Sequence, residues 1–400
     1  MTLRSLPESL RDWRGKRVLV RVDWNIPLDG SVDQESGLKL TRSFPLIDRL
    51  RRAGAIVVLI THVGRPTAQE MTLSTKHLIP FLKKHRQAIE WIKGDYSAAK
   101  DRETMLKQIV KATPGSVFLL ENLRFFAGEE KNTAVFVKTL AMFGEIFINE
   151  AFAVCHRAHA SVVGVANLLP SYAGPALEEE VTRLEAVRSA PKKPAIAFFG
   201  GKKISSKLAV LEALQKKQHA VYLGGAMAVT CEAARGKRVG ASYLEPGQKS
   251  VALKLLRHKN MRLPLDYIVA TELKEGARTR ITTADDIHEQ EIVVDVGPQT
   301  LIMWADAIRS AAAIVWNGPM GVSEISAFAA GSRGLARYLG YLPHKAEVIV
   351  GGGDTIPLLA ETGVINRVTY VSTGGGAMLA FLVEGVKLPG IQALFGKKTH

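Results

Sequence analysis

The sequence predicts an α/β protein of two domains, each built around a parallel β-sheet. At 400 residues the chain is longer than one hydrophobic core usually organises. Short apolar, β-prone runs alternate along it with helix-like runs, which is typical of βαβ units. The residues that follow the β-prone runs differ between the two halves, being cations and imidazoles in the first and glycines in the second. Each half is therefore expected to carry its own binding site.

The first half places polar side chains where its predicted strands end. The strand-like runs are RVLVRVDWN (17–25), AIVVLITHVGR (55–65), SVFLLENLR (116–124) and EIFINEAFAVCHRAHA (145–160). Ligands of open parallel sheets bind at the carboxyl ends of the strands. The candidate side chains there are Asp23, Asn25, His62, Arg65, Arg124, His156, Arg157 and His159. Arginine offers a planar fork that matches carboxylate and phosphate, so several of them predict a site for a small, highly charged anion. Taken singly, each of these residues could equally be structural.

The second half runs six apolar segments into glycine. They are PAIAFFGG (194–201), HAVYLGG (219–225), IVVDVG (292–297), AAIVWNG (312–318), EVIVGGG (347–353) and TYVSTGGG (369–376). Glycine lets backbone N–H groups approach an anion closely, because no Cβ intervenes and φ can be positive. These six ends predict a phosphate-binding face.

Helices are predicted at 43–54, 74–87, 132–144, 204–217 and 307–313. A further segment, 174–194, repeats Leu177, Val181, Leu184 and Val187 at helical spacing between Pro175 and Pro191. Because it follows the last basic cluster and precedes the first glycine cluster, we interpret it as an interdomain helix.

Composition narrows the class of protein. An apolar fraction of 47% with 23% charged residues is ordinary for a globular protein. The net charge of +15 would suit a nucleic-acid binder, but the basic residues are spread along the chain without a basic run, which favours anionic small molecules. Two distant cysteines without metal-type spacing predict a reducing compartment. No apolar run is long enough for a signal peptide or a membrane span, so a cytoplasmic location is expected.

Three motifs in the second half suit a nucleotide. In GGKKISSKLAVLEAL (200–214), Lys203 and Lys207 lie four residues apart, on one face of the first turns of a predicted helix. Cations at a helix start are unfavourable unless an anion compensates them. Both could also be solvated surface lysines. Gly201 precedes them at the end of the strand.

The second motif is GGGDTIPLLAETG (351–363), in which Gly352 and Gly353 form a turn before a helix. Asp354 and Thr355 would lie at the N-cap and first turn, with Asp354 placed to hold a Mg²⁺-phosphate. A plain capping aspartate in a tight turn is the alternative. The third motif, WNGPMGVSE (316–324), contains Asn317, Gly318 and Glu324, whose carboxylate could accept hydrogen bonds from a ribose; a purely structural loop is equally compatible.

The sequence contains no complete GxxxxGK[ST] loop, GxGxxG fingerprint, serine elbow or HExxH motif. Neither a covalent nucleophile nor a bound zinc is indicated. The chemistry that remains is phosphoryl transfer by positioning and charge neutralisation, which needs lysine, arginine, Mg²⁺ and helix N-termini.

These motifs together resemble one family, phosphoglycerate kinase. RVLVRVDWNIPLDG, THVGRP, LLENLRFF, FINEAFAVCHRAHAS, FGGKKISSK, WNGPMGVSE, VGGGDT and STGGGA follow the family's order from about residue 16 to 390. The resemblance implies two Rossmann-like domains joined by the interdomain helix and a hinge, with closure excluding water. It implies a 3-phosphoglycerate domain at 1–173, the helix at 174–190, a nucleotide domain at 191–377, and a return of 378–400 to the first domain.

The resemblance also implies roles for individual residues. The substrate side would comprise Asp23, Asn25, His62, Arg65, Arg124 and Arg157. The nucleotide side would comprise Gly201, Lys207, Asn317, Gly318, Glu324, Gly352, Gly353, Asp354 and Thr355, with Asp354 toward Mg²⁺. Catalytic roles would fall to Lys39, Arg42, Lys203, Gly353 and Gly376. The expected reaction moves a phosphoryl group reversibly between 1,3-bisphosphoglycerate and ADP, giving 3-phosphoglycerate and ATP, in a monomer that binds neither nucleic acid nor membrane.

One departure from the family pattern concerns the mechanism. Counting back from Pro45, Lys39 occupies the position of an arginine that bridges the transferring phosphoryl group. Lysine keeps the charge but lacks the bidentate fork of arginine. Arg42 lies three residues after Lys39, and the loop 30–37 precedes both residues. Further departures are Glu150, Ala153, Ser206, Val229, Gln299, Tyr370 and Ala380. The alternative to an active kinase is therefore a catalytically impaired member of the family that keeps ligand binding. A coupled assay would distinguish the two.

Overall fold

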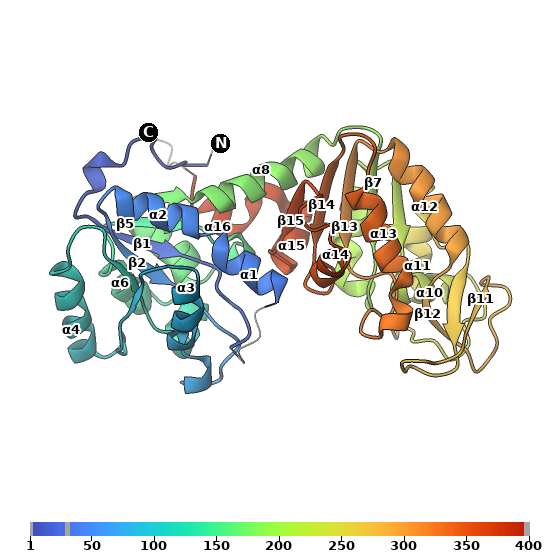
Figure 1. Ribbon diagram of the computed structural model, residues 1–400, viewed down its shortest axis with the longest axis horizontal. Coiled ribbons are helices and arrows are strands. Elements are labelled where there is room, and N and C mark those ends of the chain that lie inside the picture. The colour runs from blue at the N-terminus through green and yellow to red at the C-terminus, as the bar shows by residue number, and fades with distance from the viewer. Residues whose placement is uncertain (1–2, 29–32, 396–400) are drawn as a thin grey trace. The chain divides into compact units, whose positions relative to one another are not determined.

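The computed structural model describes residues 3–28 and 33–395. The chain divides into two compact units, Met1–Thr182 with Val386–His400 and Arg183–Gly385. We call them unit 1 and unit 2. The predicted α/β class is confirmed, because each unit contains a six-stranded parallel sheet with flanking helices (Figure 1).

The sheet of unit 1 has the strand order β3-β4-β2-β1-β5-β6. Its strands are β1 Arg17–Arg21, β2 Ile56–Ile60, β3 Glu90–Trp91, β4 Val117–Leu119, β5 Ile146–Asn149 and β6 Ser171–Ala173. All neighbours pair in parallel, with Val18 opposite both Val57 and Ile146. Every residue of β2 is buried, as expected for a strand covered on both faces.

The helices of unit 1 follow these strands. They are α1 Gln34–Thr41, α2 Phe44–Arg52, α3 Ile79–Lys84, α4 Ala99–Val110, α5 Ala127–Glu130, α6 Ala134–Ala141, α7 Val165–Leu168 and α16 Pro389–Gln392. The segment 30–37 was predicted as a loop, and this is wrong for its described part. Asp33 is the N-cap of α1, and its Oδ1 accepts a hydrogen bond of 2.8 Å from the backbone N–H of Ser36. Residues 30–32 of that loop lie outside the described ranges.

The sheet of unit 2 has the order β15-β14-β13-β7-β8-β9, again parallel throughout. Its strands are β7 Ala195–Phe199, β8 Ala220–Leu223, β9 Met261–Arg262, β13 Ala313–Asn317, β14 Glu347–Gly351 and β15 Tyr370–Ser372. Five of the six runs that end in glycine form strands of this sheet. The sixth, IVVDVG, does not: β12 Ile292–Val296 pairs antiparallel with β10 Tyr267–Ala270, whose other neighbour is β11 Thr279–Thr282.

The helices of unit 2 are α9 Leu208–Leu214, α10 Gly225–Ala234, α11 Lys249–Leu256, α12 Pro298–Ser310, α13 Ala330–Gly340, α14 Ile356–Glu361 and α15 Gly376–Glu384. The helix predicted at 307–313 is misplaced. Helix α12 ends at Ser310, and Ala313 pairs with Ala195 and Glu347 in the sheet, so strand pairing overrides the helical preference of the alanines.

Helix α8, Pro175–Ser189, contains the boundary between the two units. Proline fits its first position because the first N–H of a helix has no partner within the helix. The predicted apolar stripe is buried, with Leu177, Val181, Leu184 and Val187 each at most 6% exposed. Helix α15 belongs to unit 2, and the chain returns to unit 1 at Val386.

Candidate active site

Three arginines from separate strand ends of unit 1 line one cavity. Arg65 follows β2, Arg124 follows β4 and Arg157 follows β5, and together with Pro66, Glu130 and His159 they surround a space of about 510 Å³. Because the strands are parallel, their carboxyl ends meet at the same edge of the sheet. The cavity therefore gathers three cations around one carboxylate.

Arg124 is held in place by the loop that follows β2. Its Nη1 donates to the carbonyl oxygen of Gly64, and its Nε lies 3.4 Å from Oε1 of Glu130. Burial lowers the pKa of Arg124, and the charge of Arg157 lowers it further. An anion bound in the cavity would relieve this repulsion.

The loop 62–66 is itself fixed by two asparagines. Asn25 Oδ1 accepts a hydrogen bond of 2.8 Å from the N–H of Gly64, and Asn122 Oδ1 accepts one of 3.1 Å from the N–H of Val63. Gly64 has φ of +64°, which glycine adopts without strain. The hydrogen bond to the Asn25 carboxamide oxygen therefore positions the loop that carries Arg65.

His62 is buried and neutral. Arg21 Nη2 lies 2.9 Å from His62 Nδ1, and because arginine can only donate, Nδ1 is the acceptor and the ring proton is on Nε2. Burial, reinforced by the charge of Arg21, holds the pKa of His62 well below its usual value. Arg21 was not among the residues predicted from the sequence, although a charged residue inside the apolar run RVLVRV was a signal.

Arg21 also links His62, through a chain of hydrogen bonds, to residues beside the arginine-lined cavity. Its Nε donates to Ser161 Oγ at 3.0 Å, and Ser161 Oγ donates to Oε1 of the buried Glu129 at 2.5 Å. Glu129 Oε1 lies 3.7 Å from Nδ1 of His159. Burial and the charge of Arg157, opposed by the charge of Glu130, lower the pKa of His159 to about 4, so the ring is neutral near pH 7. The positive charge of the cavity near pH 7 is therefore carried by its arginines.

Asp23 and Lys39 are coupled electrostatically. Burial raises the pKa of Asp23, and the positive charges of Lys39 and Arg21 oppose that rise. Lys39 lies on α1, with its Nζ 2.5 Å from Glu35 Oε1. Arg42 is the residue that follows α1, and its Nη1 lies 3.8 Å from Glu180 Oε2 on α8. Lys39 and Arg42 therefore have different carboxylate partners within unit 1.

In unit 2, Lys207 approaches the main chain where β7 and β13 end. Its Nζ donates to the carbonyl oxygens of Gly200 at 2.5 Å and Asn317 at 3.4 Å. A Cβ on Gly200 would lie 1.9 Å from the carbonyl oxygen of Pro319, so only glycine fits there. Burial lowers the pKa of Lys207 to about 8, opposed by the negative charge of Asp354.

Thr355 connects the ends of β13 and β14. Its Oγ1 accepts a hydrogen bond of 2.8 Å from the N–H of Gly318, and Asn317 Nδ2 donates to the carbonyl oxygen of Gly351 at 2.9 Å. Gly318 and Gly352 have φ of +89° and +110°. Thr355 is the N-cap of α14, while Gly353 and Asp354 are exposed in the turn before it.

Other predicted residues of unit 2 follow the carboxyl ends of its strands. Lys203 precedes the 3-10 turn Ser205–Lys207, so the prediction that Lys203 and Lys207 share a helical face is wrong. The N–H of Ser205 donates instead to Oε2 of Glu245 at 3.1 Å, a carboxylate that no motif indicated. Glu324 is exposed after β13, Gly201 has φ of +106°, and Gly376 begins α15.

Among the described residues, no group of three or more His, Cys, Asp or Glu side chains could hold a metal ion. Asp354 nevertheless offers an exposed carboxylate beside the cation of Lys207. This fits Mg²⁺, which binds proteins through one or two carboxylates and keeps phosphates and waters as its other ligands.

The chain is similar to known proteins along nearly its whole length. The family model for phosphoglycerate kinase matches residues 8–385. The phosphoglycerate kinases of Xanthobacter flavus and Deinococcus radiodurans are each 40% identical to it, over 98% and 96% of this chain and 99% and 93% of theirs. The solved structure of phosphoglycerate kinase from Coxiella burnetii is 34% identical, with a TM-score of 0.85 over 98% of this chain and 99% of that one. Matches of this length and identity, on a fold with these two sites, show that the chain belongs to the phosphoglycerate kinase family.

Proposed function

We propose that this kinase holds 3-phosphoglycerate or 1,3-bisphosphoglycerate on unit 1 and the Mg²⁺ complex of ADP or ATP on unit 2. The observation that carries the proposal is the convergence of Arg65, Arg124 and Arg157 on one cavity. A glycerate bearing a carboxylate and a phosphate has two groups that suit the guanidinium fork. Neutral His62 and His159 leave the arginines as the charged groups that bind it.

On unit 2, the proposal assigns the phosphates of the nucleotide to the glycine-lined edge. Lys207 would neutralise phosphate charge, and the backbone N–H groups near Gly318, Gly352 and Gly353 would donate hydrogen bonds. Asp354 would hold the Mg²⁺, which when bound neutralises charge on the phosphates. Glu324 would accept hydrogen bonds from the ribose.

Direct contact with the transferring phosphoryl group is assigned to Lys39, Lys203 and the N–H groups of Gly353 and Gly376. Each would stabilise charge that develops on the equatorial oxygens, which is the main contribution of the protein to phosphoryl transfer. Arg42 would assist Lys39. Closure of the two units about a hinge near α8 would exclude water from the reaction.

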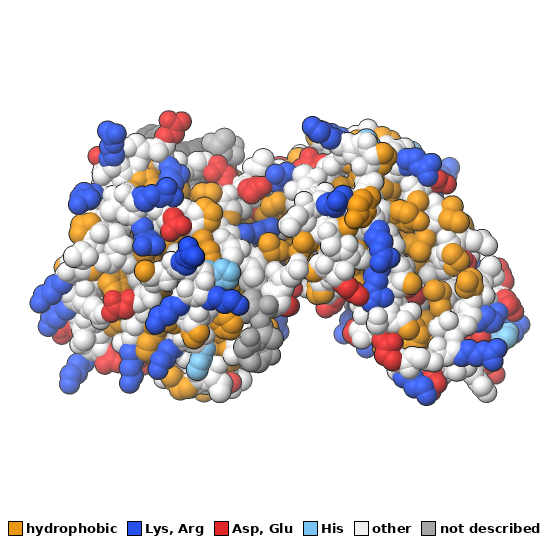
Figure 2. All heavy atoms as spheres, in the orientation of Figure 1, with side chains coloured by type: hydrophobic (Ala, Val, Ile, Leu, Met, Phe, Trp, Pro, Cys, Tyr) orange, Lys and Arg blue, Asp and Glu red, His pale blue; other side chains and the backbone are white. Residues whose placement is uncertain are grey.

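We further propose that the enzyme acts as a cytoplasmic monomer. Within the described part of the chain, none of the helices combines the length and apolar character needed to cross a membrane. On the face drawn in Figure 2, Lys and Arg side chains are scattered among acidic ones over both units instead of forming one basic stripe. That scatter favours small anionic ligands over nucleic acid as partners.

The experiment that tests the proposal is a coupled assay in both directions with Mg²⁺, combined with nucleotide titration. ATP formation from 1,3-bisphosphoglycerate and ADP supports it. Nucleotide binding without turnover, even at high enzyme concentration, would instead support the impaired family member. Tight, salt-dependent binding of DNA at physiological salt would contradict the assignment of small-molecule partners.

A further inference from the structure

The turn that leads into α9 is held by a carboxylate from a distant segment of unit 2. Glu245, between α10 and α11, accepts hydrogen bonds at both of its oxygens: Oε2 from the N–H of Ser205 at 3.1 Å, and Oε1 from the Ser205 hydroxyl. Ser205 opens the 3-10 turn Ser205–Lys207, after which α9 begins. The first N–H groups of a helix have no partner within the helix, so an acceptor from elsewhere fixes where the helix starts. Glu245 therefore holds the turn that separates Lys203 from Lys207.

The charge of Glu245 is stabilised by this turn. Burial raises the pKa of Glu245, but hydrogen bonds from Ser205 and from the N–H of Ile204 outweigh that effect, and the pKa lies below its usual value. The positive charge of Lys203 lowers the pKa further. Glu245 is thus an anion at the start of a helix, where negative charge is favourable.

Glu245 is in turn anchored to α10. Its N–H donates to Thr230 Oγ1 in α10 at 3.4 Å. In the first turn of the same helix, the N–H of Met227 donates to the carbonyl oxygen of Gly201 at 3.2 Å. The segment that contains Lys203 is therefore attached to α10 on both sides, before Lys203 through Gly201 and after it through Glu245.

Two further contacts hold the residues next to Lys203. The Nζ of Lys202 lies 4.6 Å from the centre of the Tyr243 ring, two residues before the carboxylate. On the other side, Ile204 is fully buried, and Ser206 Oγ donates to the carbonyl oxygen of Lys203 at 2.9 Å. Lys203 itself is exposed, so its side chain extends from a backbone that is fixed by its neighbours.

We propose that Glu245 is a positioning residue of this kinase: through the Ser205 turn, it fixes the backbone from which Lys203 reaches the transferring phosphoryl group. The inference rests on the proposed role of Lys203 in phosphoryl transfer. Misplacing a charged group by about 1 Å can lower a rate about 10²-fold, so a residue that never touches the substrate can affect kcat.

Glutamine should replace Glu245 better than alanine does. The contacts to the turn are hydrogen bonds, and glutamine can accept the N–H of Ser205 at Oε1 while donating from Nε2 to Ser205 Oγ. Glu245→Gln therefore keeps the position of the turn and removes the charge.

The test is a double-mutant cycle, measured as kcat in the coupled assay with Mg²⁺ and saturating substrates. Glu245→Ala should lower kcat about tenfold, and Glu245→Gln should stay within about threefold of wild type. In a protein that already carries Lys203→Ala, the change Glu245→Ala should lower kcat by less than about twofold, because the side chain that it positions is gone. A full tenfold loss in that background, or equal kcat values in the glutamine and alanine variants, would overturn the proposal.

The single variant Lys203→Ala separates this inference from the proposed function. A normal kcat in Lys203→Ala would contradict the proposed role of Lys203, and the positioning role of Glu245 would fall with it. A low kcat in Lys203→Ala, followed by the full further loss on Glu245→Ala, would overturn the positioning role alone.

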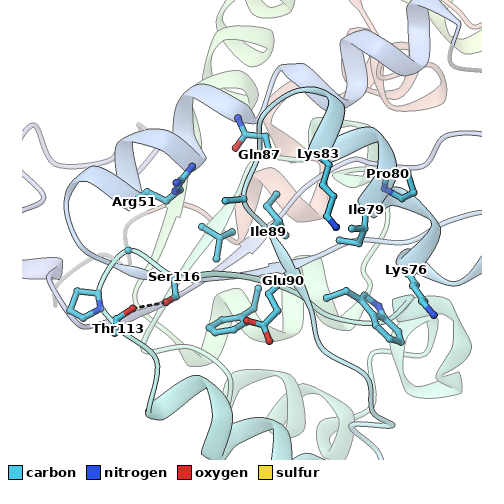
Figure 3. A pocket seen from close by; sticks show the side chains of 16 residues that line it. Arg51, Lys76, Ile79, Pro80, Lys83, Gln87, Ile89, Glu90, Thr113 and Ser116 are labelled. Carbon is cyan, nitrogen blue, oxygen red and sulfur yellow. Dashed lines mark hydrogen bonds between the residues drawn. The ribbon is translucent and has the colours of Figure 1, made fainter.

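Two other glutamates provide matched controls. Glu212 Oε1 on α9 accepts a hydrogen bond of 2.7 Å from Lys254 Nζ, and Glu90 Oε1 accepts one of 2.6 Å from Gln108 Nε2. Figure 3 shows Glu90 among the residues that line a cavity of unit 1, where it begins β3. Glu212→Ala and Glu90→Ala should leave kcat unchanged. A tenfold loss in either one would show that the effect is not specific to Glu245 and would overturn the assignment.

Ser205→Ala keeps the cycle informative if the urea midpoint shows that Glu245→Ala fails to fold. It removes the hydroxyl that donates to Glu245 and leaves the N–H in place. We expect it to lower kcat about threefold in the wild-type background and to have no effect beside Lys203→Ala. The same loss in both backgrounds would overturn the proposal.

Discussion

The Nζ of Lys39 lies 2.5 Å from Oε1 of Glu35, one turn earlier on α1. Lys39, which the resemblance predicts to stand in the place of the family's arginine, is therefore paired within its own helix. Burial raises the pKa of Asp23, and the charge of Lys39 lowers it in part. To contact a phosphoryl group, the ammonium of Lys39 has to share or leave the Glu35 carboxylate.

Lys39→Ala is expected to lower kcat about 10²-fold, because a cation that stabilises transition-state charge is lost. Glu35→Gln should raise kcat/KM several-fold by freeing the ammonium. Steady-state kinetics in the coupled assay measures both. Arg42→Ala should lower kcat less than Lys39→Ala does, because Arg42 only assists Lys39 and its Nη1 lies 3.8 Å from Glu180 Oε2 on α8. Normal turnover in the double variant Lys39→Ala, Arg42→Ala would refute the role assigned to this pair.

We expect the affinity for nucleotide to depend on pH through Lys207. Because burial lowers its pKa to about 8, the free enzyme carries this cation below pH 8 and loses it above. The Kd for ADP should therefore rise about tenfold between pH 7 and pH 9.5. Lys207→Met should bind ADP weakly with little change over the same range. Lys202→Met, a neighbour that packs over Tyr243, should keep the wild-type profile. A flat wild-type profile would contradict the assignment.

Thr355→Val is expected to destabilise unit 2 and weaken nucleotide binding. The valine leaves the N–H of Gly318 without its acceptor, at a cost of about 1–3 kcal/mol. Urea unfolding and calorimetric titration with ADP measure the two effects. Thr355→Ser keeps the hydroxyl and should stay close to wild type. If the serine variant loses as much as the valine variant, the hydrogen bond is not the cause.

Arg157→Gln should raise the KM for 3-phosphoglycerate at least tenfold, because the cavity loses one of its cations. The same change should raise the melting temperature of the free enzyme, since the charge of Arg157 lowers the pKa values of Arg124 and His159. Kinetics and calorimetric melting test both parts. The KM for ADP is the internal control, and a comparable rise in it would argue against a local effect on the glycerate site.

We expect the buried Glu150 to make the stability of the wild-type protein depend on pH. Burial raises its pKa to about 8, although its Oε2 accepts a hydrogen bond of 3.1 Å from the N–H of Ala176 in α8. The folded protein therefore holds this proton more tightly than the unfolded chain. The stabilisation is complete below about pH 4.5 and is lost as the pH rises through 8. Glu150→Gln cannot ionise, so its free energy of unfolding relative to wild type should increase between pH 5 and 8. Parallel urea midpoints across this range would contradict the prediction.

The sequence allowed the fold class and the main sheet edges to be predicted because both depend on local patterns. Fully apolar runs such as IVVLI and AIAFF mark buried parallel strands, and β2 and β7 are buried at every position. Pro175 and the stripe from Leu177 to Val187 likewise predicted α8. Where a local pattern was ambiguous, the prediction failed: IVVDVG reads like the other runs before glycine, yet it pairs antiparallel outside the main sheet.

Partners of side chains could not be predicted, because they depend on residues that are distant in the sequence. Nothing near Arg21 indicates that it donates to His62, and nothing near Ser205 indicates that Glu245 accepts its N–H. Arg42 likewise lies near Glu180, which is far from it in the sequence. The pairing of Lys39 with Glu35 differs, because these two residues lie four apart on one helix.

The sequence by itself determined that the chain forms parallel α/β sheets, that arginines follow the strands of one half, and that glycines follow those of the other. Periodicity and residue type carry that information along the chain. The tertiary structure alone decided that Arg65, Arg124 and Arg157 share a cavity, that His62 is neutral, and that Lys207 titrates near pH 8. Charge states and shared cavities depend on burial and on distances between strands, which exist only once the sheets have formed.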